Sequence, residues 1–549
     1  MPSNVSPSAA ALVPVDIRRF PWIRRIAADY AFAYENVAPF FSGNPADDAA
    51  WRDAIARSQA ATRRPSELAA VLAAQQERRQ APAAARAAAQ TLADPDAVVV
   101  ITGQQAGLFG GPLFTLLKAI TAMKLAARVT RDFGVTAVPV FWIDAEDHDW
   151  AEVSACTVLG ADHEPHIVRL ADLPGAGHLP IARLVLGDGI APSIDALAAA
   201  LPATEFRDEL LTTIRNAYRP GTGMAEAFGR LLEQVLGPHG LVVYDASDPA
   251  AKPLARDVFV REIAEPGVTG QLAADAGHAL EARGYHSQVT PHEGAVSLFY
   301  INGGREAIRY AGDRATIGDR EVPLSALADE ARTSPERFSP NVLLRPIVQD
   351  AIFPTICYVA GPNELAYLGQ LRDIYGRFGV PMPLMYQRAT ATVVDSASMR
   401  FLTKYELPLE ALQPQDEAAL NDLLESQLPP TVEQSLQAAA AALEERMAAV
   451  AEAVPQIDPT LDGAVKSTLG KLRHDLRTLH GKVIQAAKRR DETLRRQFQR
   501  TQALAFPHGH PQEREVGFVW FLNRYGPAVV ERLVDELPLE MGRHWVMTI

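Results

Sequence analysis

The order of apolar and polar positions divides the chain into a region of short strands and helices and a later region of long helices. In the first region, four β-branched apolar residues at 98–101 predict a buried strand, and glycines within 102–112 predict a tight turn. A second apolar run at 136–143 predicts another strand. Between the two strands, apolar residues recur at helical spacing, at Leu113, Leu116, Leu117, Ile120 and Leu125. This strand, helix and strand unit predicts a parallel sheet with a right-handed crossover, whose ligands bind at the carboxyl ends of the strands.

The remaining segments of this region fit the same α/β class. Helical composition dominates before the first strand and again between the later strands, over 21–91, 205–236 and 249–285. Short buried strands are predicted at 240–245 and 356–360, and a β-hairpin at 297–310 around Asn302, Gly303 and Gly304. The scattered prolines and glycines of 174–193 indicate an insertion, and residues 1–16 are predicted to be disordered or loosely attached.

The last third of the chain carries two apolar stripes at helical spacing. The first consists of Val432, Leu436, Ala439, Leu443, Met447 and Val450, and the second of Leu469, Leu472, Leu476, Leu479, Val483 and Ala486. A proline-bearing break at 454–459 separates them, which predicts an antiparallel coiled-coil hairpin. The second helix is rich in Lys and Arg, with Lys471, Arg473, Arg477, Lys482, Lys488, Arg489, Arg490, Arg495, Arg496 and Arg500. These cations form either a solvated face or a surface for an acidic partner or a phosphate ligand.

Composition excludes several classes of protein. The net charge of −13 argues against nucleic acid as the main partner, because phosphate binding needs a basic face. We find no apolar run long enough to span a membrane and no signal-peptide core, so we expect a cytoplasmic protein. The two cysteines, Cys156 and Cys357, are far apart in the sequence, support neither a disulfide framework nor a zinc site, and are expected in the core.

The glycine-rich turn at 102–112 is the first candidate site. A turn between a strand and a helix directs backbone N–H groups and the positive end of the helix dipole at an anionic ligand. The glycine spacing matches neither G-x-G-x-x-G nor a phosphate loop with its lysine. The alternative is a tight connection without a ligand.

An acidic cluster follows the second strand, at 144–152. It contains Glu146, Asp147, His148 and Asp149, and crowding of these carboxylates is expected to raise the pKa of the histidine and of at least one carboxyl group. Such a cluster suits general acid/base catalysis, binding of an ammonium group, or coordination of Mg²⁺. The alternative is an acidic helix N-terminus.

A third cluster spans 339–350 and 360–367. Arg345 lies within an apolar run, where a guanidinium needs a carboxylate or a phosphate, and an internal ion pair is the alternative. Asn363 is a candidate helix cap, and Glu364 and Tyr367 would share one helix face.

Together these motifs resemble the cysteine-adding enzyme family of bacillithiol biosynthesis, usually described as cysteine ligases. The resemblance rests on five blocks spread over the chain, which are Thr102–Gly107 with Gly111, Pro112 and Lys118; Pro139–Ile143 with Glu146–Asp149; Ser339–Asn341 with Leu344–Pro346; Gly361–Glu364 with Tyr367; and Phe506–Gly509 with Pro511–Arg514.

The resemblance implies a Rossmann-like parallel-sheet core with connecting insertions and a C-terminal α-helical antiparallel coiled-coil domain that forms a homodimer. We therefore expect four segments, namely 1–150 with the N-terminal helices and the first half of the core, a connecting insertion at 151–240, the second half of the core at 241–395 with a hairpin insertion near 286–310, and the helical domain at 396–549. The implied activity joins the carboxyl group of cysteine to the amino group of glucosaminyl malate, which is the last step of bacillithiol assembly.

Amide formation from a carboxylate in water requires an activated acyl group, so ATP with Mg²⁺ is the expected cofactor. The H-x-G-H and K-M-S-K-S signatures of the class I synthetases, which the family resembles in core fold, are absent, and no metal site is recognised. We expect His148 or Asp147 to accept the proton of the amine, with Glu146 and Asp149 in the same catalytic cluster. The residues expected to bind substrate or nucleotide are Gly103, Gln104, Gln105, Gly107, Thr115, Lys118, Asn341, Arg345, Asn363, Glu364 and Tyr367. The alternatives are a non-catalytic nucleotide-binding scaffold of a thiol pathway and a nucleotidyltransferase with another substrate.

Overall fold

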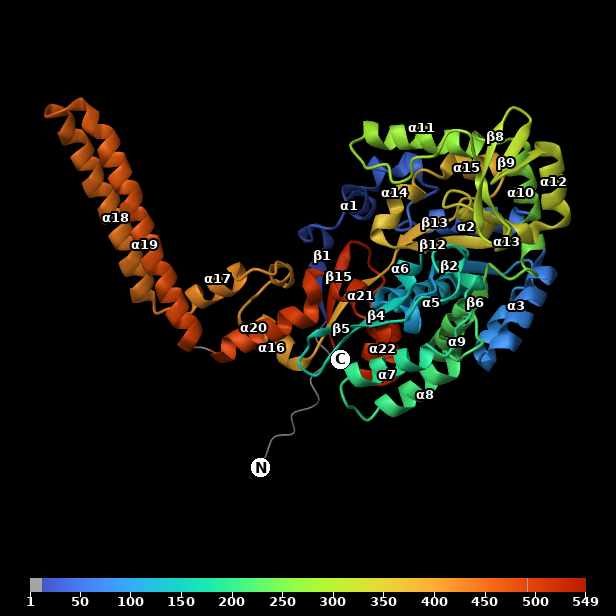
Figure 1. Cartoon of the computed structure of the whole chain (residues 1–549), viewed down its shortest axis with the longest axis horizontal. Helices are drawn as coiled ribbons and strands as arrows, with labels where there is room; N and C mark the ends of the chain where they lie inside the picture. The colour runs from blue at the N-terminus through green and yellow to red at the C-terminus, as the bar shows by residue number, and fades with distance from the viewer. Residues whose placement is uncertain (1–11, 491) are drawn as a thin grey trace. The chain divides into compact units, whose positions relative to one another are not determined.

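The computed structural model describes residues 12–490 and 492–549, which form two compact units (Figure 1). The first unit contains Met1–Val393 together with Pro511–Ile549, and the second contains Val394–His510. In the described part of the chain, every helix is too short or too polar to cross a membrane.

A five-stranded parallel sheet lies at the centre of the first unit. Its strand order is β13 (Leu384–Gln387), β12 (Thr355–Ala360), β2 (Val98–Gln105), β3 (Ala137–Asp144) and β6 (Val242–Asp245). Helix α5 (Leu113–Phe133) connects β2 to the parallel strand β3, so the predicted unit and the Rossmann-like class are confirmed. Strand β2 extends four residues beyond the predicted run, and Gly103 and Gln104 therefore belong to the strand rather than to a turn.

Both faces of this sheet are covered by apolar side chains. Val98 and Val100 pack on one face with residues of α2 (Asp48–Ala60) and α5, whereas Val99 and Ile101 point into the larger core on the other face. This alternation follows from the two-residue period of a strand. Cys156 and Cys357 are buried, as predicted.

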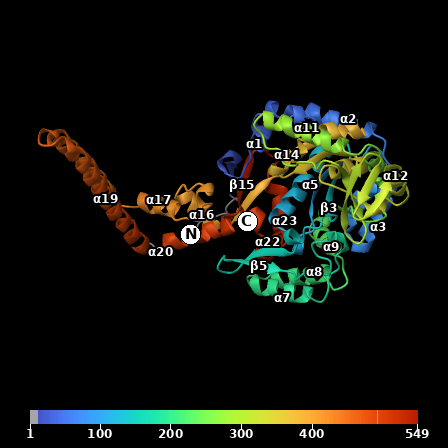
Figure 2. The ribbon, with the colours of Figure 1, turned by 45° about the horizontal axis from the view of Figure 1, so that its top comes forward.

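The helices around the sheet lie partly within the predicted helical segments 21–91, 205–236 and 249–285 and partly outside them. They are α1 (Arg25–Phe32), α3 (Pro65–Arg79), α4 (Ala83–Thr91), α6 (Trp150–Val153), α7 (Ile190–Ala200), α8 (Arg207–Ala217), α9 (Met224–Leu236), α10 (Arg256–Ala264), α11 (Val268–Ala282), α12 (Leu324–Thr333), α13 (Arg345–Ile352), α14 (Leu365–Leu368) and α15 (Arg372–Phe378). In both views α11 lies on the opposite side of this unit from α7 and α8 (Figure 1, Figure 2).

The predicted hairpin is part of a second, antiparallel sheet. Its strand order is β10 (Arg320–Pro323), β9 (Arg314–Ile317), β8 (Arg305–Ala311), β7 (Ala295–Ile301) and β11 (Phe338–Pro340). Strands β7 and β8 pair directly across the Asn302–Gly304 turn, with Ile301 opposite Arg305. The insertion therefore continues to residue 340 instead of ending near 310. A separate pair, β4 (Ala155–Leu159) and β5 (Pro165–Arg169), lies within the segment predicted as the first insertion.

The two ends of the chain differ from the prediction. Residues 1–11 lie outside the described residues, but 12–16 form strand β1 (Leu12–Asp16), which pairs with β15 (Arg543–Thr548) beside β14 (Thr390–Val394). The polar start of the chain gave no indication of this strand because its partner lies more than 500 residues away in the sequence. Residues 511–549, expected in the helical domain, belong to the first unit, where α21 (Gln512–Glu515), α22 (Phe518–Tyr525) and α23 (Ala528–Glu536) contact α5.

The second unit is helical, and the predicted hairpin is confirmed. Helices α18 (Pro430–Ala453) and α19 (Asp462–Arg490) contact each other along the hairpin and are linked by an ion pair between Glu444 and Arg473. The unit also contains α16 (Ser396–Lys404), α17 (Ala418–Ser426) and α20 (Glu492–Ala505). The side chains of Lys488, Arg489 and Arg490, part of the predicted basic face, lie outside the described residues.

Candidate functional site

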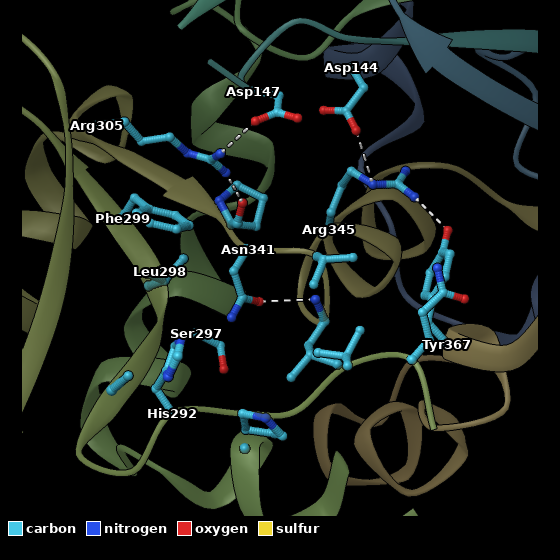
Figure 3. A pocket seen from close by; sticks show the side chains of 18 of the residues that line it. Asp144, Asp147, His292, Ser297, Leu298, Phe299, Arg305, Asn341, Arg345 and Tyr367 are labelled. Carbon is cyan, nitrogen blue, oxygen red and sulfur yellow. Dashed lines mark hydrogen bonds and ion pairs between the residues drawn. The ribbon is translucent and has the colours of Figure 1, made fainter. Parts of the chain in front are cut away.

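A cavity of about 900 Å³ opens in the first unit at the carboxyl ends of β2 and β3. The antiparallel sheet forms its opposite wall (Figure 3). The lining residues with polar groups include Gln104, Gln105, Lys118, Asp144, Asp147, Glu152, His292, Ser297, Arg305, Asn341, Arg345, Tyr358, Glu364 and Tyr367. The cavity thus lies at the edge of the sheet that the sequence predicted.

Asp144, the last residue of β3, and Asp147, three residues later, face the cavity and bind cationic side chains from different elements. The Asp144 carboxylate lies 3.5 Å from Nε of Arg345, and the Asp147 carboxylate lies 3.5 Å from Arg305 (Figure 3). Asp147 also accepts a hydrogen bond of 2.8 Å from the amide of Gln105. These contacts hold Asp147 at the cavity wall with one side open to a ligand, since about a third of its side chain remains exposed.

The other residues of the predicted catalytic cluster lie outside the cavity lining. Glu146 is buried in an ion pair with Lys252, which also donates to the carbonyl of Phe338. Asp149 caps α6 by accepting the backbone N–H of Glu152, so the alternative of an acidic helix N-terminus applies to it. His148 is half exposed, with Nδ1 3.4 Å from the carboxylate of Asp147. Because consecutive residues in an irregular turn point in different directions, only Asp147 of these four faces the cavity.

The pKa values of two carboxyl groups in and beside this cluster are raised, chiefly by burial rather than by the crowding of charges on which the prediction rested. Burial raises the pKa of Glu146, and Lys252 opposes this effect. Partial burial raises the pKa of Glu152, which lines the cavity; a hydrogen bond from Gln105 opposes the shift, and Asp149, Asp147 and Asp144 add to it. Glu152 is therefore a carboxyl group at the cavity with an increased affinity for protons.

The N-terminus of α5 does not open into the cavity. The backbone N–H of Leu113 donates to the carbonyl of Val516, the N–H of Phe518 donates to the carbonyl of Gly111, and the Phe518 ring packs against Gly110. Thr115 is fully buried, the carbonyl of Gly107 accepts a hydrogen bond from the hydroxyl of Tyr218, and neither residue lines the cavity. The structure therefore does not support the predicted anion site at this helix terminus. A segment about 400 residues later in the sequence covers the terminus.

Lys118 lies at the floor of the cavity and is saturated by protein oxygens. Its ammonium group donates to the carbonyl of Gly103 at 3.0 Å, to Oε1 of Gln104 at 3.2 Å, and to the carboxylate of Glu364. Burial lowers its pKa, and the attraction of Glu364 opposes this shift. Lys118 and Glu364 thus hold each other, and they shape the floor of the cavity.

Arg345, Asn341 and Tyr367 meet at the cavity as predicted. Arg345, at the start of α13, donates to the hydroxyl of Tyr367 at 3.2 Å (Figure 3). The side-chain oxygen of Asn341 accepts the backbone N–H groups of Leu343 and Leu344, which fixes the turn before α13. Asn363 lies outside the lining of this cavity, so its predicted role in binding is not supported by its position.

Sequence reasoning missed Arg305, the first residue of β8. Its guanidinium lies 4.0 Å from the ring centre of Phe299 and donates to the carbonyl of Pro340 at 2.9 Å. Its Nε is buried and has no hydrogen-bond partner among the described residues. The only signal in the sequence was its place directly after the hairpin turn, where the partner strand and Asp147 could not be anticipated.

Two family models match nearly the whole chain. Residues 15–389 match the N-terminal Rossmann-like domain of bacillithiol biosynthesis BshC, and residues 391–549 match its C-terminal coiled-coil domain. The chain belongs to the BshC family.

Curated relatives agree with this assignment to BshC. A protein of Salinibacter ruber is 34% identical over 561 residues, which cover all of both chains, and bears the name "Putative cysteine ligase BshC". Proteins of the same name from Symbiobacterium thermophilum and Koribacter versatilis are 35% and 34% identical, with 83% and 80% of this chain and 84% and 82% of the relatives covered.

The cavity of this BshC chain offers two kinds of recognition. Arg305 and Arg345 present guanidinium groups, which bind carboxylates and phosphates, while Asp147 and Glu152 present carboxyl groups suited to an amine or ammonium group. Cationic and anionic groups within one cavity can place an acidic substrate and a nucleophilic amine side by side.

Proposed function

We propose that this BshC-family enzyme joins the carboxyl group of L-cysteine to the amino group of glucosaminyl malate, the last step of bacillithiol assembly. The observation that carries the proposal is that the cation Arg345 and the carboxylate Asp147 both line the same cavity. A dicarboxylate with a nearby amine requires both a cation and a proton acceptor, and the family membership supplies the reaction class.

Arg345 and Asn341 are proposed to bind a malate carboxylate. Arg345 already contacts Asp144 and Tyr367, which orient its guanidinium at the wall, and Oδ1 of Asn341 is fixed by the backbone of the following turn. Positioning a rigid, planar cation in advance lowers the entropic cost of binding a carboxylate.

Asp147 is proposed as the group that accepts the proton of the attacking amine. An amine attacks a carbonyl only in its neutral form, so the ammonium group of the sugar must lose a proton to a nearby base. Asp147 lines the cavity, and Gln105 and Arg305 fix its carboxylate. Glu152, which lines the same cavity and whose pKa is raised, is the proposed next acceptor of the proton.

ATP with Mg²⁺ is the proposed source of activation. When bound, it supplies the phosphoryl or adenylyl group that makes the cysteine carboxylate an acyl donor. The donor set at the cavity fits this group, because Arg305 has an unpartnered buried Nε in the described structure and Asp144 offers carboxylate oxygens of the kind that Mg²⁺ prefers. Arg305 would contact phosphate oxygens, and Asp144 would hold the ion.

The test incubates the purified protein with cysteine, glucosaminyl malate and ATP-Mg²⁺, and detects the condensed thiol and the nucleotide products by mass spectrometry. Condensed thiol with AMP supports an adenylate route, and condensed thiol with ADP supports an acyl phosphate. Pyrophosphate without an amide would favour a nucleotidyltransferase. Tight binding of all components without product would favour a non-catalytic scaffold.

Two variants separate the proposed roles of the arginines. Arg345→Lys is expected to raise KM for glucosaminyl malate by about tenfold or more, because lysine lacks the bidentate fork, and to leave KM for ATP unchanged. Arg305→Lys is expected to raise KM for ATP instead. Arg314→Lys, an exposed residue of β9 paired with Glu321, is the control. Unchanged KM values in both variants would make the two arginines structural ion-pair partners.

A homodimer through the coiled coil is also proposed. On the hairpin, Val450, Leu472 and Leu479 keep 38–51% of their surface exposed in the single chain. A second hairpin would bury this stripe. Leu479→Glu should convert a dimer to a monomer in light scattering, and a wild-type monomer would refute the proposal.

We also propose that the reaction takes place in the cytoplasm, where the ATP that it requires is made.

A further inference from the structure

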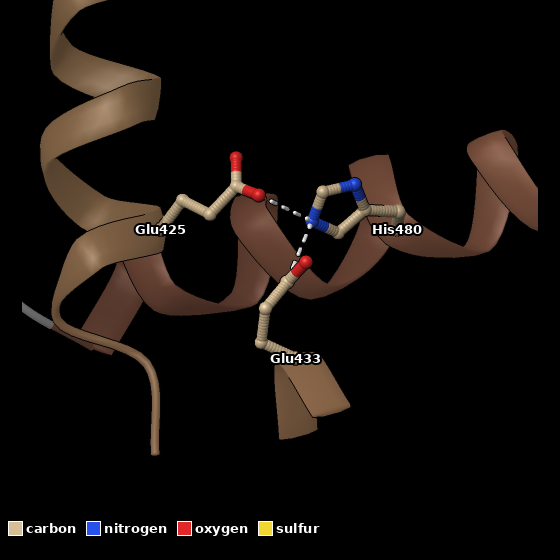
Figure 4. A group of neighbouring side chains, drawn as sticks. All are labelled: Glu425, Glu433 and His480. Carbon is tan, nitrogen blue, oxygen red and sulfur yellow. Dashed lines mark ion pairs between the residues drawn. The ribbon is translucent and has the colours of Figure 1, made fainter. Parts of the chain in front are cut away.

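Three ligand-type side chains meet at one end of the helical hairpin in the second unit. Glu425 comes from the last turn of α17, Glu433 from the first turn of α18, and His480 from the middle of α19 (Figure 4). Nε2 of His480 lies 3.5 Å from Oε1 of Glu425 and 3.6 Å from Oε2 of Glu433. One ligand atom of each residue lies within 4.8 Å of the other two.

The atoms at the centre of this group are removed from water without being satisfied. Oε2 of Glu433 and Nε2 of His480 are both buried, and neither has a hydrogen-bond partner among the described residues. The other oxygen of Glu433 accepts the amide of Gln437 at 2.9 Å, which fixes the carboxylate with Oε2 toward the histidine. A buried carboxylate oxygen and a buried imidazole nitrogen that make no hydrogen bond are costly, so this arrangement favours a bound cation.

We propose that Glu425, Glu433 and His480 bind a divalent transition-metal ion of the zinc class. Two ligand atoms that each lie about 2.1 Å from a tetrahedral ion are about 3.4 Å apart. The two measured separations from Nε2 are close to this value. An imidazole nitrogen together with two carboxylates suits Zn²⁺ or Co²⁺, whereas Mg²⁺ and Ca²⁺ prefer oxygen ligands alone.

The charge around the site supports a cation. Two carboxylates and a neutral imidazole carry a charge of −2, which a divalent ion neutralises. Arg473, about two helical turns before His480, is engaged by the carboxylate of Glu444. Three protein ligands leave one tetrahedral position for water or another ligand, as in open zinc sites.

The bound ion would join α17 to both helices of the hairpin. Without it, α17 is held by its buried apolar residues Leu420, Leu423 and Leu424, and a short segment separates it from α18. Because ions that bind only the folded state stabilise it, the metal would resist separation of α17 from the hairpin. The sequence gave no sign of the site, because its ligands are 8 and 47 residues apart and come from three helices.

The experiment uses the full-length protein after removal of metal with a chelator. Zn²⁺ is titrated by calorimetry, and Co²⁺ binding is followed by its visible absorption, which is intense in tetrahedral sites. Wild type should bind one more ion per chain than His480→Ala, with a tetrahedral Co²⁺ spectrum that the variant lacks. The matched control is His474→Ala, an exposed histidine of the same helix, which should retain the ion.

A second variant keeps the test decisive if the loss of the imidazole disturbs the helices. Glu433→Gln preserves size and the contact with Gln437, and it should weaken Zn²⁺ binding at least about tenfold with an unchanged far-ultraviolet circular dichroism spectrum. Equal Zn²⁺ stoichiometry and affinity in wild type, His480→Ala and Glu433→Gln would overturn the proposal. In that case the histidine serves only as an ion-pair partner of the two glutamates.

Discussion

Lys118 and Glu364 bind each other at the floor of the cavity, joining α5 to the turn after β12. Both residues carry the type of charge that the sequence assigned to ligand binding. The ammonium of Lys118 is nevertheless fully engaged by Glu364, Gly103 and Gln104, so its charge is neutralised within the protein. A ligand that enters the cavity meets the arginines and Asp147 in place of Lys118.

Replacing Lys118 should therefore reduce stability. Lys118→Met leaves the Glu364 carboxylate without its cation, and we expect a loss of about 3 kcal/mol, at the low end for buried pairs because a quarter of the Glu364 side chain is exposed. Urea unfolding followed by tryptophan fluorescence measures this unit, because all six tryptophans lie in it. Arg131→Met, an exposed residue of the same helix, should change stability by less than about 0.5 kcal/mol.

Asp147 and its neighbour His148 should differ in their effect on turnover. Asp147→Asn removes the proposed proton acceptor while keeping the contact with Gln105 possible, and turnover should fall about 100-fold or more. His148→Ala should keep turnover within about threefold of wild type, because this side chain is half exposed and outside the cavity lining. Single-turnover product formation measures the turnover of both variants. A loss of turnover in His148→Ala as large as that in Asp147→Asn would identify His148 as the proton acceptor.

The covered N-terminus of α5 can be tested at Gly110. A Cβ atom there would lie 2.3 Å from the Phe518 ring, and φ is +89°, so Gly110→Ala should destabilise the first unit by about 3 kcal/mol. Gly134 also has positive φ, +70°, but no atom within 4 Å of its Cβ position, and its alanine variant should lose about 1 kcal/mol. Equal losses in urea unfolding would mean that the segment at 516–518 does not pack on this turn.

His544 should make the first unit less stable in acid. Burial lowers its pKa from 6.5 to about 4, while its ring contacts the hydroxyls of Thr390 and Thr392. Since the unfolded histidine takes up a proton near pH 6.5 and the folded one only near pH 4, its contribution is complete above pH 6.5. It falls by about 3 kcal/mol as the pH drops to 4.

The measurement compares the urea midpoint between pH 7 and pH 4.5 in wild type, His544→Gln and His239→Gln. His544→Gln should flatten the pH dependence, whereas the exposed His239 should leave it unchanged. A wild-type slope retained in His544→Gln would assign the acid sensitivity to other groups.

The strand and helix pattern could be predicted because it depends on local spacing. The run at 98–101, the stripe of α5 and the run at 136–143 gave the parallel unit, and the repeat of apolar positions gave the hairpin of α18 and α19. The edge of the sheet that holds the cavity followed from chain direction alone. The end of β2 was misjudged, because Gly103 and Gln104 are extended by pairing with β3, which local composition does not encode.

The sequence by itself thus determined the fold class, the hairpin and the edge at which ligands bind. Tertiary structure alone decided that Asp147 faces the cavity while Glu146 pairs with Lys252, that Arg305 enters the site, and that residues 516–518 cover α5. The physical reason is that secondary structure follows from interactions between residues a few positions apart. The environment of a charged side chain depends instead on partners hundreds of residues away, whose identity the local pattern does not contain.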